Sequence, residues 1–176
     1  MIFYLLHFQV EGAAQMVFVD ASSNMEEHNL KVYLSCTHSV AEALPLGLEI
    51  CSDETTETLI QAFKMYRDSL PSHAFFHSGE RGPLIFMTDN CVEERDALNI
   101  VWPLAALLLC TFHILQQVWR WLGETKHGVH VDERAALMKK FKDLVYAETV
   151  TDYGNVYRQV LRSNCVKKAV SELVSF

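Results

Sequence analysis

Two aspartates each follow a short apolar segment, where they could act together on one ligand. Asp20 follows Met16–Val19, and Asp89 follows Pro83–Thr88. Open α/β sheets place ligand sites at the carboxyl ends of their strands, so both side chains are candidates for one site if the strands are neighbours. Adjacent carboxylates repel each other, and a divalent cation such as Mg2+ or Mn2+ relieves that repulsion. The pattern predicts metal-assisted phosphoryl transfer; the alternative is that both aspartates only cap turns or helices.

A second candidate is the Cys-x-x-His pair of Cys110 and His113, which could supply half of a tetrahedral Zn2+ site. No second pair has matching spacing, and the nearby candidates are Cys91, His127 and His130. We prefer a packed thiol and a hydrogen-bonded imidazole at a strand–helix joint. The five cysteines include no Cys-x-x-Cys, which argues against a disulfide framework and predicts a reducing compartment.

The charges of the chain are unevenly distributed. Residues 1–118 hold 5 Lys/Arg against 15 Asp/Glu, residues 119–176 hold 10 against 7, and the whole chain has a net charge of -7. The surface as a whole does not attract phosphates, so DNA would need a local basic patch. Lys139, Lys140 and Lys142 lie in the basic part. If they share one face of a helix, they could contact successive phosphates of a DNA backbone; if they are scattered, they are solvated charges with no specific role.

Two tryptophans near that basic part are also candidates for recognition. Trp119 and Trp121 lie two positions apart in an expected helix, so they cannot both face one core. The exposed one could stack on a base or a partner helix, or it could cover the helical part of the chain.

The elements that must position these residues are strands first and helices later. Strands are expected over residues 16–19, 31–37, 44–51, 83–88 and 105–110, and the first three suggest an antiparallel meander. Helices are expected over residues 56–70, 93–101, 113–122, 134–147, 153–161 and 166–174, with a loop over 72–81 and Asp132 as a helix cap. The order predicts a mixed-sheet α/β (α+β) core over residues 1–118 and an all-helical annex over 119–176.

Four segments then occur in a recognisable order. They are Met16-Val-Phe-Val-Asp20-Ala-Ser-Ser, Pro45-Leu-Gly-Leu, Ile85-Phe-Met-Thr-Asp89-Asn and Leu107-Leu-Leu-Cys110-Thr-Phe-His113. In this order they resemble the catalytic core of Mutator-like element DDE transposases, over about residues 15–160. The resemblance implies an RNase H-like fold with Asp20 on the first strand and Asp89 on the fourth. It also implies Mg2+ or Mn2+ as cofactor, and DNA cleavage and strand transfer as the ancestral chemistry.

The chain departs from that family at the third catalytic acid, a glutamate that commonly stands in a Glu-Ser-x-Asn stretch. Ser163-Asn164 lacks the glutamate. Glu148 is the remaining candidate for a third ligand, on an expected helix, but it falls where the family has its helical insertion. We therefore expect a transposase-derived core that ends before its third acid and is inactive alone. The alternative is a domesticated or fragmentary module that binds DNA or protein without catalysis.

The expected location and partners follow from these observations. DNA is the partner that the resemblance implies, self-association is left open, and the expected location is the nucleus. The apolar run over residues 100–115 is interrupted by Pro103 and His113 and is shorter than the ~20 residues of a membrane span, so it is expected to be buried core.

Overall fold

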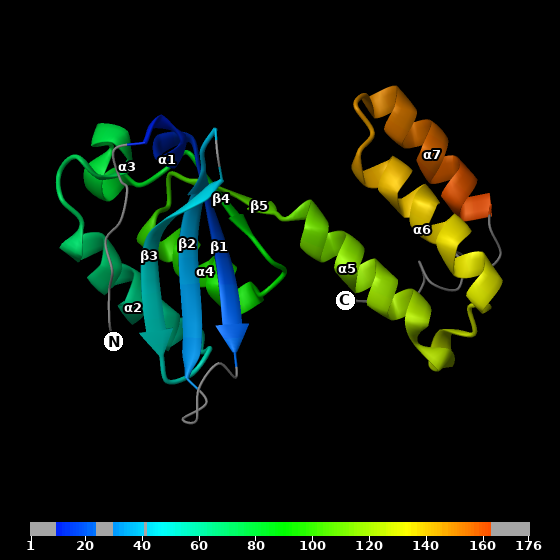
Figure 1. The fold of residues 1–176 in the computed structure, drawn as a ribbon, viewed down its shortest axis with the longest axis horizontal. Coiled ribbons are helices and arrows are strands. Elements are labelled where there is room, and N and C mark those ends of the chain that lie inside the picture. Colours follow the sequence, from blue (N-terminus) through cyan, green and yellow to red (C-terminus); the bar gives the residue numbers. More distant parts are fainter. Residues whose placement is uncertain (1–9, 24–29, 41, 163–176) are drawn as a thin grey trace. The chain divides into compact units, whose positions relative to one another are not determined.

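The computed structural model describes residues 10–23, 30–40 and 42–162, which form two compact units (Figure 1). The chain divides between Cys110 and Thr111. The boundary expected at residue 118 lies inside a helix that begins at Thr111. The helix expected over residues 166–174 lies outside the described residues.

The first unit is built on a five-stranded mixed sheet in the order β3-β2-β1-β4-β5. Its strands are β1 (Met16–Ser23), β2 (Lys31–His38), β3 (Ala43–Cys51), β4 (Ile85–Thr88) and β5 (Ala106–Leu109). The first three pair antiparallel, whereas β4 runs parallel to β1 and β5 runs parallel to β4. The predicted mixed α/β class and the predicted meander are both confirmed.

Strand β1 is longer than the sequence indicated. The strand was expected over residues 16–19, whereas β1 continues through Asp20 to Ser23. The extension occurs because β2 pairs along it, with Asp20 opposite Leu34 and Ser23 opposite Lys31. Backbone pairing outweighs the weak turn preference of the serines, so Asp20 lies inside a strand.

The described part of the first unit contains the α-helices α1 (Glu11–Gln15), α2 (Thr56–Ser69), α3 (Ala74–His77) and α4 (Val92–Val101) and the short 3-10 helix η1 (Gly79–Arg81). The N-cap residue of α2 is Thr55, whose hydroxyl accepts the N–H of Thr58 at 3.4 Å. Helix α2 packs beside α4 on one face of the sheet (Figure 1). Helix α1 was not predicted, since five residues are too few to show a helical period.

The core of this unit is centred on Trp102, which is 2 % exposed. Its indole lies 5.1 Å from the ring of Phe86 and 6.3 Å from the rings of Phe63 and Tyr66. Gly82, with a φ of +73°, passes so close that an added Cβ would lie 2.5 Å from Cδ1 of the indole. A side chain at this position would therefore displace the central ring of the core.

The segment predicted as a loop over residues 72–81 contains an unusual left-handed turn. Phe75, Phe76 and His77 have φ values of 47°, 50° and 69°. A non-glycine residue in this conformation costs roughly 1–2 kcal/mol. Phe75 is fully buried, and its ring lies 6.5 Å from Trp102, so aromatic packing holds the turn in place.

The second unit consists of α5 (Thr111–Gly123), α6 (Val131–Val145) and α7 (Val150–Arg162). A small core joins Leu122, Val129, Leu137 and Val160. Helix α6 begins earlier than predicted, so Asp132 lies in its first turn and His130 is the N-cap residue. Within the described part of the chain, no helix combines the length and apolar character needed to cross a membrane.

Candidate functional site

The pairing of β1 with β4 brings Asp20 and Asp89 to matching positions. Phe18 is opposite Met87 in this parallel pair, and each aspartate lies two residues further along its chain. Neighbouring strands are about 4.8 Å apart, and residues at matching positions project to the same side of a sheet. The two carboxylates therefore share one end and one face of the sheet. Asp20 is exposed and Asp89 is half-buried.

Asp89 also shapes the start of the following helix. Its Oδ1 accepts the backbone N–H of Cys91 at 2.7 Å, immediately before α4. The hydroxyl of Thr88 donates to the Asp89 carbonyl at 2.9 Å and fixes the backbone at the strand end. Asp89 thus holds the turn before α4, whose N-cap residue is Cys91, and this hydrogen bond uses one of its two carboxylate oxygens.

Two further acids near this site were missed at the level of sequence. Glu94 on α4 and Glu49 on β3 are both 0 % exposed. Their carboxyl oxygens make no hydrogen bond with any residue that the structure describes. In a helical period, Glu94 falls on the same face as the buried Ala97, Leu98 and Val101, so the sequence did contain a signal that Glu94 is buried.

Burial is the main cause of an unusual ionisation of both groups. It raises the pKa of Glu49 to about 8 and the pKa of Glu94 to about 8. The charges of Asp89, Asp20 and Glu49, in decreasing order, raise the pKa of Glu94 further. Glu94 therefore lies close enough to the strand-end aspartates to be repelled by both.

This arrangement favours a cation at the strand ends. Carboxylate oxygens are hard ligands of the kind that Mg2+ and Mn2+ prefer, and a bound cation would offset the repulsion that reaches Glu94. Among the described residues, however, no three His, Cys, Asp or Glu side chains are grouped to hold a metal ion. In the described structure, the carboxylates available to such an ion at this end of the sheet are those of the pair Asp20 and Asp89.

Glu148, the candidate for a third ligand, lies in the second unit. It is exposed in the bend between α6 and α7 and not on a helix as predicted, because α6 ends at Val145 and α7 begins at Val150. Asp20 and Asp89 belong to the first unit, so the described structure does not assemble the three acids within one unit.

Cys110 and His113 occupy the predicted joint between a strand and a helix. The Cys110 N–H donates to the carbonyl of Thr88 at 2.7 Å and so extends the β4–β5 ladder by one residue. His113 lies in the first turn of α5, with its ring 5.4 Å from the ring of Phe112. Both side chains are half-buried.

The other candidate zinc ligands make contacts of their own. His127 stacks on Trp121 with ring centroids 4.0 Å apart, and His130 lies 3.2 Å from Asp132. The Cys91 thiol donates to Glu93 at 3.3 Å. Within the described ranges, these residues do not complete a metal site around the Cys-x-x-His pair.

The basic and aromatic candidates of the second unit are partly satisfied within it. Lys139 pairs with Asp143 at 2.9 Å, and Lys142 is exposed on the same side of α6, whereas Lys140 is turned about 100° away from Lys139. Trp119 is 53 % exposed and Trp121 is half-buried, which confirms that the two indoles do not share a core.

Comparison with known proteins adds little to this geometry. No protein-family profile matches the chain. Over 106 residues the chain is 30 % identical to part of the PKS-NRPS hybrid synthetase cheA of Chaetomium globosum. That stretch covers 58 % of this chain but only 2 % of the synthetase, so the chain spans a very small part of the relative it matches.

Proposed function

We propose that the first unit is an RNase H-like core derived from a Mutator-like DDE transposase, with Asp20 and Asp89 as ligands of a divalent cation. The observation that carries the proposal is the register of β1 and β4, which sets the two aspartates side by side at one end of the sheet. An aspartate on the first strand and another at the end of the fourth is the placement that the resemblance implies.

In this proposal the cation would activate an attacking oxygen and stabilise the leaving oxygen of a phosphodiester. The carboxylates of Asp20 and Asp89 would bind it, and the hydrogen bond from Cys91 would keep Asp89 oriented toward it. Two protein carboxylates hold such an ion weakly, because Mg2+ favours near-octahedral coordination. We therefore expect the chain to bind the ion but not to cut DNA by itself.

Binding of the ion is tested by titrating Mn2+ into the protein and recording the electron paramagnetic resonance signal of free Mn2+. We expect weak binding that Asp20→Asn and Asp89→Asn each reduce about tenfold or more, because each removes one ligand charge. The matched control is Asp68→Asn, which changes an exposed aspartate of α2 and should leave binding unchanged. Equal binding by the Asp20→Asn/Asp89→Asn double variant would contradict the assignment of the site.

Catalysis is tested separately with supercoiled plasmid and Mg2+ or Mn2+. We expect no nicking above the level of the Asp20→Asn/Asp89→Asn variant. If the unmodified chain nicks the plasmid clearly and Asp20→Asn abolishes the nicking, the assignment of the site stands, but the expectation that the chain is inactive alone is wrong.

The alternative function is a DNA-binding module, which the positive charge of residues 119–176 and the exposed Lys142 favour. In that case DNA binding should weaken steeply with salt, survive Asp89→Asn, and be lost when Lys139, Lys140 and Lys142 are changed to Glu. No binding at low salt would exclude this alternative.

A further inference from the structure

The two outer strands of the sheet differ in how they are protected. Strand β3 contains Pro45, faces a register shift between Ser35 and Cys36 of β2, and carries the inward-pointing Glu49. Proline, irregular pairing and inward charges are the features that block edge-to-edge association. Strand β5, Ala-Leu-Leu-Leu, has none of them, so its own sequence does not block pairing at its outer edge.

The outer edge of β5 presents backbone groups for another strand. Ala106 donates its N–H to Leu84 at 2.9 Å and Cys110 donates to Thr88 at 2.7 Å, so the even-numbered amides point toward β4. Because alternate residues of a strand direct their backbone groups to opposite sides, the N–H and C=O groups of Leu107 and Leu109 point away from β4. No strand of the described chain pairs with this side.

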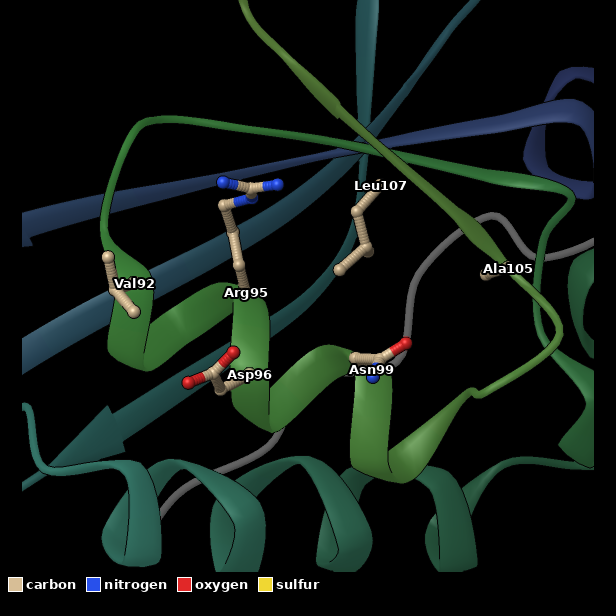
Figure 2. Close-up of a pocket in the computed structure, with 6 residues that line it drawn as sticks. All are labelled: Val92, Arg95, Asp96, Asn99, Ala105 and Leu107. Atoms are coloured by element: carbon tan, nitrogen blue, oxygen red, sulfur yellow. The ribbon is translucent and has the colours of Figure 1, made fainter. Parts of the chain in front are cut away.

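A cavity of about 340 Å3 lies beside that edge, between α4 and β5. Figure 2 shows four residues of α4 lining it, Val92, Arg95, Asp96 and Asn99, together with Ala105 and Leu107. The Nε of Arg95 is buried and makes no hydrogen bond with any described residue. Within the same residues neither Arg95 nor Asp96 forms an ion pair, in contrast to Arg67, which pairs with Asp68 at 3.0 Å. The cavity wall thus carries one cation and one anion that lack partners in the described part of the chain.

The four helical residues of this wall are arranged symmetrically about a point between Arg95 and Asp96. Consider a second copy of α4 that lies antiparallel to the first, related to it by a two-fold axis through that point. Arg95 of one copy then meets Asp96 of the other, and Val92 meets Asn99. Leu107 lines the same cavity, so a two-fold axis at this level also brings the two β5 edges together. An isologous contact of this kind pairs both charges at once.

We propose that the β5 edge and the adjoining face of α4 form a self-association surface that binds a second copy of this chain. The two copies join their sheets through antiparallel β5 strands and pair Arg95 with Asp96 in both directions. The side-by-side Arg95 and Asp96 favour a second copy as occupant, because a cation beside an anion is complementary to its own antiparallel copy. A polyanion such as DNA would be repelled there by Asp96 and by the 15 Asp/Glu against 5 Lys/Arg of residues 1–118. The exposed Val92 and Leu108, 59 % and 44 % exposed, add apolar area at the same edge.

The test is sedimentation equilibrium of the full chain over a range from about 1 µM to 1 mM, which covers the affinities expected for a small interface. We expect a monomer–dimer equilibrium in the unmodified protein. Arg95→Asp and Asp96→Arg should each weaken the dimer at least about tenfold, since each places like charges opposite each other. The two variants mixed in equal amounts should associate again, because every Asp then faces an Arg, and the double variant Arg95→Asp/Asp96→Arg should also recover.

Two matched controls separate this surface from general charge effects. Arg81→Asp and Glu57→Arg reverse single charges at exposed positions of the same unit, and they should not alter the dimer. Leu108→Lys places a charge on the open strand and should weaken it without touching Arg95 or Asp96. A strictly monomeric unmodified chain, a dimer unaffected by both single variants, or a mixture of the two variants that stays monomeric would each overturn the proposal.

Discussion

Two pairs of acids in the first unit respond to opposite environments. Asp20 lies within β1 and Asp89 directly follows β4, at matching positions of neighbouring strands, and Asp20 is exposed while Asp89 is half-buried. Glu49 and Glu94 are fully buried and make no side-chain hydrogen bond with the described residues. A carboxylate costs little free energy at the first site and a great deal at the second. The first pair is suited to binding a ligand, whereas the second makes folding depend on pH.

The largest expected effect is the pH dependence caused by the buried pair. Each glutamate has a folded-state pKa of about 8 against an ordinary value of 4.5, so its proton is taken up on folding. The contribution of these two groups to the free energy of unfolding is therefore fully present below about pH 4.5. It falls by at most about 1.4 kcal/mol per pH unit for each group as the pH rises to about 8. Glu94→Gln should remove about half of this slope, as measured by urea unfolding at several pH values.

The double variant Glu49→Gln/Glu94→Gln should remove nearly all of that contribution. Glu57→Gln, at an exposed position in the first turn of α2, is the control and should keep the slope of the unmodified chain. If the slope is unchanged in both buried variants, then these two acids ionise like exposed ones and the contrast between the pairs is lost.

A smaller effect is expected at the strand end, where Asp89 is also a structural residue. Asp89→Ala removes the acceptor of the Cys91 N–H and should lower the free energy of unfolding by about 1 kcal/mol. Asp89→Asn keeps an oxygen at this position and should cost clearly less. Thermal or urea unfolding of both variants at one pH measures the difference. Equal losses would mean that the charge of Asp89, and not its hydrogen bond, supports α4.

The smallest effect links the two pairs directly. The charges of Asp89 and Asp20 raise the pKa of Glu94, and that of Asp89 does so more strongly. Asp89→Asn should therefore lower the pKa of Glu94 by a fraction of a unit, and Asp20→Asn by less. The carboxylic C=O stretch in infrared spectra, recorded against pH in the Glu49→Gln background, reports the shift. A pKa of Glu94 that responds to neither change would separate the two sites.

The sequence predicted the strand-end pair because each aspartate follows a run of apolar residues. It predicted the end of β1 wrongly, since pairing with Lys31–Leu34 extends the strand, and such pairing depends on residues distant in the sequence. Glu94 was not singled out because it stands in a helix with other acids at Glu93 and Asp96. Its spacing from Ala97, Leu98 and Val101 nevertheless places it on the apolar face of α4, and that face packs against the rest of the first unit.

Two other differences have the same origin. The left-handed turn at Phe75–His77 contains no glycine, so nothing local indicates its conformation, and it exists because Phe75 packs on Trp102. The helix predicted over residues 134–147 was too long at its end, since α6 ends at Val145 and Glu148 lies in the bend that follows. Pairing, ring packing and helix ends were thus harder to predict than the order of the elements.

The position of Trp102 at the centre of the first core has a practical optical consequence. The chain has 3 tryptophans, and the other two, Trp119 and Trp121, belong to the helical unit. With both of those changed to Phe, the remaining indole would emit from an apolar environment when the sheet is folded and shift to longer wavelengths when it opens. Such a chain would carry its own fluorophore for following the unfolding of the sheet separately from that of the helices.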